Sequence, residues 1–179
     1  MWALIVIAII AAYGILTYNA LVKLRVRVDN AWSDTDVQLK RRHDLVPNLV
    51  ETVKGYASHE KGTLEAVIAA RAQAMAAQGP EARAQAENML TGALKSLFAL
   101  SEAYPQLRAS ENFSSLQAQL ASLEEAIQNA RRYYHAVVRD LNTRIQQFPS
   151  NIVARAGGFR EREFFEIEEG ERAVPRVSF

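Results

Sequence analysis

The fold is decided by residues 113–148, FSSLQAQLASLEEAIQNARRYYHAVVRDLNTRIQQF, which contain neither proline nor glycine. Apolar side chains recur there at intervals of three and four, and they are Phe113, Leu116, Leu120, Leu123, Ile127, Ala130, Tyr134, Val137, Leu141, Ile145 and Phe148. This spacing puts them on one stripe of an α-helix. It predicts a single helix of roughly 54 Å that ends at Pro149. Because such a stripe is not stable in water, other helices must cover it.

Three earlier segments show the same helical spacing and can provide that cover, namely residues 24–56, 63–77 and 81–104. Gly79 suits a C-terminal cap, Pro80 suits the first turn of the next helix, and Ser110 suits the cap of the long helix. Short connections of this kind join antiparallel neighbours. The sequence therefore predicts an all-α chain in which residues 23–148 form an elongated antiparallel four-helix bundle. We expect the core to include Trp32, Leu49, Leu97, Leu120, Leu123 and Tyr134.

Two places leave the helix boundaries open. Pro47 lies inside a helical pattern, and because it lacks a backbone donor we expect a kink or a break near residues 44–46. The segment from Gly55 to Gly62 contains two glycines around polar residues. A helix either continues through this segment or restarts after a turn with Thr63 as its cap.

The first 22 residues contain no charged side chain and are apolar almost throughout. About 20 apolar residues are enough to cross the hydrocarbon layer as a helix. A cleaved signal peptide is the alternative, but no basic stretch precedes the run, and a helical stripe continues out of it through Leu21, Leu24 and Val28. A buried soluble helix is disfavoured because no neighbouring segment is comparably apolar. The sequence predicts a retained transmembrane anchor that contacts the lipid bilayer through residues 1–22.

The charges that flank this anchor predict its orientation. Lys23, Arg25 and Arg27 follow it directly, whereas only the α-amino group precedes it. The positive-inside tendency places the N-terminus outside and the bundle in the cytoplasm. A second basic run, residues 40–42, begins about 18 residues beyond the anchor, roughly 27 Å along a helix, and is expected to be a solvated face.

The tail, residues 149–179, has an irregular composition with a Gly-Gly pair and mixed charges. Its large apolar side chains are Phe159, Phe164, Phe165, Ile167, Val174, Val177 and Phe179. Either the tail is disordered, as termini often are, or it is a strap that docks these side chains on the bundle or on another subunit.

The sequence contains no arrangement typical of a catalytic, cofactor or metal site. His59-Glu60 begins like a zinc-protease helix, but Thr63 stands where the second histidine is needed. The di-iron pattern requires Glu three residues before His, and those positions hold Lys40, Tyr56 and Arg132. The histidines, His43, His59 and His135, are scattered, and each is expected to be a surface or hydrogen-bonded residue. Cysteine is absent, and a net charge of +1 gives no argument for nucleic acid.

Long strings of this sequence resemble the LemA family of bacterial membrane proteins. They are AWSDTDVQLKRRHDLVPNLVETVKGYASHEKGTLEAVIAAR from residue 31, SEAYPQLRASENFSSLQAQL from residue 101, ARRYYHAVVRDLNTRIQQFPSNIVA from residue 130, and VPRVSF at the end. The resemblance implies a single-span anchor and a cytoplasmic helical bundle, with associations to membrane organisation, including a magnetosome-related relative, and to envelope quality control beside a membrane metalloprotease. It implies no known reaction. His135 replaces an expected Asn and Thr35 a larger aliphatic residue. The resemblance also covers the polar block Arg41, Arg42, His43, Asp44 and Asn48, without a mechanism for it.

These observations favour a non-enzymatic scaffold of the bacterial inner membrane that forms homo-oligomers and docks a membrane-protein partner. Small residues that permit close helix approach are Ala69, Ala70, Ala72, Ala74, Ala76 and Ala77, with Ala8 and Ala12 in the anchor. The alternative is an adaptor or signal-transmitting subunit of a membrane complex such as a membrane protease. An enzyme of unrecognised type is the third hypothesis.

Overall fold

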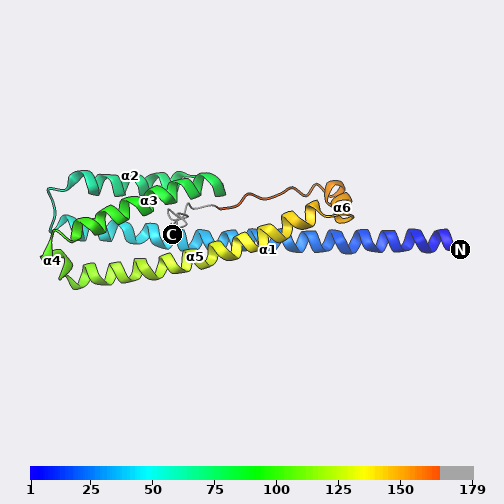
Figure 1. Cartoon of the computed structure of the whole chain (residues 1–179), viewed down its shortest axis with the longest axis horizontal. Helices are drawn as coiled ribbons and strands as arrows, with labels where there is room; N and C mark the ends of the chain where they lie inside the picture. The colour runs from blue at the N-terminus through cyan, green and yellow to red at the C-terminus, as the bar shows by residue number, and fades with distance from the viewer. Residues whose placement is uncertain (166–179) are drawn as a thin grey trace, which may run out of the picture. The chain divides into compact units, whose positions relative to one another are not determined.

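The computed structural model describes residues 1–165, and all regular structure in that range is helical (Figure 1). The helices are α1 (Trp2–Lys54), α2 (Lys61–Ala76), α3 (Pro80–Ser101), α4 (Pro105–Arg108), α5 (Glu111–Gln146) and α6 (Ser150–Ala156). The prediction of an all-α chain with a long apolar N-terminal helix is confirmed for these residues.

Helix α5 is the helix predicted from the apolar stripe. Ser110 caps it as expected, since its Oγ accepts a hydrogen bond from the Phe113 backbone N–H at 3.5 Å. Most stripe residues are buried or half-buried, but Phe148 is 80% exposed. The reason is that α5 ends at Gln146, so Phe148 leaves the stripe.

Helix α1 continues without a break through Pro47, so of the expected kink or break near residues 44–46 the break does not occur. Proline at position 47 removes the N–H that would bond the carbonyl of His43 four residues earlier. That carbonyl instead accepts a hydrogen bond from the Arg71 Nε at 2.7 Å. An arginine of α2 thus satisfies the acceptor that the proline leaves open, and the helix continues.

The connections between helices correct two predicted caps. Helix α1 ends at Lys54 and α2 begins at Lys61, so the helix restarts after the Gly55–Gly62 segment. Residue Glu60, not Thr63, occupies the cap position of α2. Gly79 has φ +83° and caps the start of α3 instead of the end of α2, while Pro80 opens α3 as expected.

The chain divides into two compact units. The first consists of Met1–Arg42 and Ala118–Phe164, and in it α1 and α5 run antiparallel (Figure 1). Its buried apolar side chains include Val28, Leu39, Ile127, Val138 and Leu141. The rings of Trp32 and Tyr134 lie 5.4 Å apart between these helices.

The described part of the second unit consists of His43–Gln117 and Phe165. Helices α2 and α3 lie side by side and antiparallel in it (Figure 1). Its buried side chains include Val46, Leu49, Val67, Leu90, Leu97 and Leu107. The rings of Phe98 and Phe113 meet edge to face at 6.1 Å.

Of the predicted core residues, Leu49, Leu97, Leu120 and Tyr134 are buried, whereas Trp32 and Leu123 are half-buried. Trp32 and Leu123 therefore lie at the margin of the packed surface. The four-helix arrangement of residues 23–148 and the division into an anchor 1–22, a bundle 23–148 and a tail 149–179 stay predictions.

Candidate functional site

The first turns of α1 form an apolar surface that the described residues leave uncovered. Every residue from Trp2 to Leu16 is exposed except Gly14, which is half-exposed. Among the described residues, α1 is the one helix long and apolar enough to cross a membrane, and only 11% of its apolar window is buried. A core helix of a soluble protein would be mostly buried. The N-terminal helix therefore fits a membrane protein.

The cover of α1 begins abruptly at Thr17, which is buried together with Leu21. On this part of α1 the Tyr18 ring meets the Phe159 ring edge to face at 5.4 Å. A Cβ at Gly157 would lie 2.8 Å from the Phe159 ring and 3.1 Å from the Tyr18 ring, so a larger residue there would force these rings to move. The segment after α6 is thus packed against the last turns of the apolar run.

The extended segment that follows is tied to α5 by its backbone. Asn142 donates from Nδ2 to the Arg162 carbonyl and accepts the Arg162 N–H at Oδ1, both at 2.9 Å. The Tyr134 hydroxyl donates to the Glu163 carbonyl at 2.9 Å. Up to residue 164, the tail therefore behaves as the strap that the sequence suggested. The predicted docking of Ile167, Val174, Val177 and Phe179 lies outside the described residues.

Burial controls the ionisation of one phenol in this strap contact. Burial raises the pKa of Tyr134 above its ordinary value of 10.0, and the carboxylates of Glu163 and Asp29 add to the effect. The Arg162 guanidinium opposes it. Arg162 also pairs with Asp29 of α1 at 2.9 Å, on the surface. Tyr134 is therefore a neutral hydrogen-bond donor at physiological pH.

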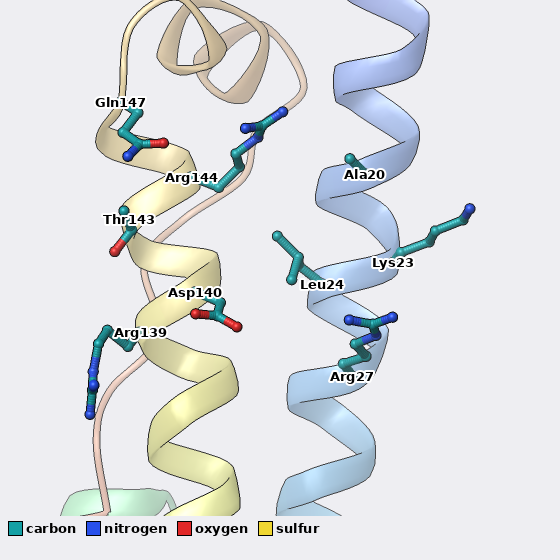
Figure 2. A pocket seen from close by; sticks show the side chains of 9 residues that line it. All are labelled: Ala20, Lys23, Leu24, Arg27, Arg139, Asp140, Thr143, Arg144 and Gln147. Carbon is teal, nitrogen blue, oxygen red and sulfur yellow. The ribbon is translucent and has the colours of Figure 1, made fainter.

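A groove of about 490 Å³ lies between α1 and the end of α5 in the first unit (Figure 2). Ala20 and Leu24 form part of its wall, and its charged lining residues are Lys23, Arg27, Arg139, Asp140 and Arg144. Figure 2 shows Arg144 and Asp140 extending from α5 toward α1, whereas Lys23 and Arg139 point outward at the two sides. Within residues 1–165, none of these charged side chains forms an ion pair. One carboxylate thus lies beside an open space that Arg27 and Arg144 also line, with Lys23 and Arg139 at the two sides.

Two members of the polar block that starts at residue 41 are buried, not solvated. Arg42 is 2% exposed and pairs with Glu124 of α5 at 2.9 Å within the first unit. The expectation of a solvated face therefore holds for Lys40 and Arg41 but is wrong for Arg42. A buried guanidinium requires such a partner, because an unpaired charge away from water is costly.

His43 begins the second unit with a buried polar contact. Its Nε2 lies 2.7 Å from Oε1 of Glu87, and both side chains are buried. The same residue's carbonyl accepts the Arg71 bond described above. His43 therefore connects α1 to α2 through its backbone and to α3 through its side chain. Its surroundings fit a structural role, as expected for an isolated histidine.

The remaining polar groups show no constellation for chemistry within residues 1–165. No group of three or more His, Cys, Asp or Glu residues in that range could hold a metal ion. His59 is exposed, and His135 lies against the Phe164 ring at 5.5 Å. The Tyr104 hydroxyl donates to Glu60 at 3.1 Å, and this bond raises the pKa of Tyr104. The three histidines have separate surroundings, so no two of them lie together.

The sequence did not predict the groove. Lys23 and Arg27 indicated only the orientation of the anchor, and no prediction involved Arg139 or Arg144. The available signal was their position: the two arginines lie near the C-terminal end of the long helix, which an antiparallel pairing brings next to the anchor.

The sequence of this chain is similar to a family sequence model and to several known proteins. The model of the LemA family matches residues 31–179. Magnetosome protein MamQ 2 of Paramagnetospirillum magneticum is 25% identical over 187 residues, which cover 90% of this chain and 68% of that protein. Magnetosome protein MamQ of Magnetospirillum gryphiswaldense is 23% identical over 177 residues, 84% of this chain and 65% of that protein. Protein LemA of Metamycoplasma hominis is 25% identical over 159 residues, 86% of this chain and 71% of that protein.

Proposed function

Because this chain belongs to the LemA family, we propose that it is a membrane-anchored helical scaffold that self-associates and docks a membrane-protein partner without catalysing a reaction. The observation that carries the proposal is the uncovered apolar surface of Trp2–Leu16. In water this surface would favour aggregation, whereas in hydrocarbon it is stable. The protein resides in the bacterial inner membrane.

Alkaline extraction of membranes that contain the full chain tests the anchor. An integral protein stays in the membrane pellet, and release into the supernatant would overturn the proposal. The absence of cysteine allows single-cysteine labelling with a membrane-impermeant maleimide in spheroplasts. A cysteine in a short Gly-Ser-Cys extension inserted between Met1 and Trp2 should react before lysis, and Ser58→Cys only after lysis. The reverse order would overturn the proposed orientation, with the N-terminus outside.

The exposed face of α2 supports self-association. Its exposed small and apolar residues are Ile68, Ala69, Ala72, Met75 and Ala76, which recur at helical spacing. Such a face permits close approach of a second helix. The anchor offers a further small-residue pair, Ala8 and Ala12, which are also exposed.

Mass photometry of the full chain in detergent tests this face. The double variant Ile68→Lys with Met75→Lys should shift an oligomer toward the monomer, because it introduces two charges into an apolar contact. The control, Gln73→Lys with Gln85→Lys, adds the same charge at exposed polar positions and should leave the distribution unchanged. A wild-type protein that is monomeric at all concentrations would refute self-association.

The names of the magnetosome relatives support a setting in membrane organisation. Envelope quality control beside a membrane protease is the other setting that the family resemblance implies. The continuity of α1 from Trp2 to Lys54 favours an adaptor as the second candidate, because one helix joins the anchor to the rest of the chain. Cross-linking in intact cells followed by mass spectrometry distinguishes the scaffold from the adaptor. A scaffold should give mainly cross-links between copies of this chain, and an adaptor should give a stoichiometric protease partner.

A further inference from the structure

We propose that the groove between α1 and α5 binds the phosphate of an anionic phospholipid headgroup. The proposal rests on the proposed membrane anchor and adds a specific lipid contact to it. Arg27 and Arg144 would bind the phosphate oxygens, since guanidinium groups donate paired hydrogen bonds to phosphate. Lys23 and Arg139 add positive potential at the sides.

The level of the groove along α1 matches the headgroup layer. A hydrocarbon core of about 30 Å takes about 20 helical residues, so a span that begins at Trp2 ends near Leu21. Lys23 and Arg27 then lie roughly 3 to 9 Å beyond the hydrocarbon boundary. The headgroup region of one leaflet is about 5–8 Å thick. Lys23 therefore lies within the headgroup layer, and Arg27 lies at its outer edge, from which a long arginine side chain can reach back to a lipid phosphate.

The charges of the groove fit an anion. Lys23, Arg27, Arg139 and Arg144 oppose the single carboxylate of Asp140, and none of the five has an ion-pair partner within residues 1–165. Arg27 and Arg144 line the space and Lys23 and Arg139 lie at its sides, so these unpaired cations repel one another, and an anion in the space would relieve the repulsion. Asp140 faces the same space, and its negative charge weakens anion binding. Removing that charge should therefore strengthen binding, whereas removing the arginines should weaken it.

An exposed apolar corner beside the groove favours a lipid over a soluble anion. Phe148 and Ile152, at the turn from α5 to α6, are 80% and 60% exposed. The contact of Phe159 with Tyr18 holds the segment after α6 against the last turns of the apolar run. At that depth, exposed apolar side chains can enter the acyl boundary while the basic residues contact headgroups. A free phosphate would leave this apolar corner unexplained.

Lipid binding to the full chain in a mild uncharged detergent tests the proposal. Phosphatidylglycerol and phosphatidylcholine are titrated separately, and retained lipid is counted by native mass spectrometry. The wild type should prefer phosphatidylglycerol. The double variant Arg27→Gln with Arg144→Gln should bind it roughly 30-fold more weakly, because each basic residue near an anionic surface contributes a factor of about five. Asp140→Asn should bind it more tightly than the wild type.

The matched control is Arg41→Gln with Arg132→Gln, which removes one exposed arginine from α1 and one from α5 outside the groove. It should keep the wild-type preference, and the melting temperatures without lipid show that each variant folds. Equal affinity for the two lipids, or an equal loss in the control, would overturn the groove proposal. Displacement of the lipid by equimolar inorganic phosphate would overturn it in favour of a soluble anion. None of these results affects alkaline extraction, so the anchor and the groove can fail separately.

Discussion

The hydrogen bond from Arg71 to the His43 carbonyl should stabilise the protein because Pro47 leaves that carbonyl without a partner in its own helix. Pro47 has no N–H, so this carbonyl lacks its helical partner, and the Arg71 Nε at 2.7 Å replaces it. A hydrogen bond that involves a charged group contributes about 1.5–3 kcal/mol. Arg71→Ala should therefore destabilise the protein by about 2 kcal/mol. For a chain of this size, that corresponds to a fall in melting temperature of roughly 4–8 °C.

The same substitution in a Pro47→Ala background isolates the cause. Pro47→Ala restores a backbone N–H that can bond the His43 carbonyl within the helix, so the loss of Arg71 should cost at most half as much. The difference between the two backgrounds is the coupling energy of a double-mutant cycle, measured by thermal unfolding of the full chain in detergent. Arg71→Ala with the same cost in both backgrounds would refute the reasoning, since the arginine would then stabilise the fold by another contact.

Three further outcomes follow from buried contacts. Glu87→Ala should lower the stability by about 3–5 kcal/mol, because it leaves the buried His43 without its partner; a neutral effect in thermal unfolding would contradict this. Leu120→Ala should cost about 2–5 kcal/mol and Leu123→Ala clearly less, because Leu123 is only half-buried, and equal losses would show that the burial pattern is wrong. The wild type should exceed Tyr134→Phe by about 1 kcal/mol at neutral pH through its hydrogen bond. Because the pKa of Tyr134 is raised in the folded protein, that advantage persists below about pH 10 and is lost as the pH rises through the folded pKa; an advantage that survives at still higher pH would disprove the assignment.

The elements that follow from local periodicity could be predicted from the sequence. The spacing of Leu120, Ile127, Tyr134 and Leu141 fixes one face of α5, and each of these side chains is buried. Such a pattern depends only on helix geometry, which is the same in every protein. It could not show where the stripe stops, because Phe148 continues the spacing although the helix has already ended.

The features that depend on distant residues could not be predicted. Pro47 reads as a helix breaker by every local rule, and only the position of Arg71 on another helix reverses that rule. The groove has the same origin. Arg27 and Arg144 are ordinary surface residues in the sequence, and they line one space only through the register of α1 against α5. No local pattern encodes that register.

The contact between Tyr18 and Phe159 can form only late in the synthesis of the chain. The two residues are separated by roughly 140 positions, and a ribosome adds about 5–20 residues per second, so Phe159 emerges on the order of 7–28 s after Tyr18. During that interval the side of α1 that carries Tyr18 lacks the segment that contacts it in the finished protein. The nascent chain therefore depends on the bilayer or on a chaperone to protect this surface. Slower translation upstream of α5 would lengthen the exposure and increase the yield of aggregated chains.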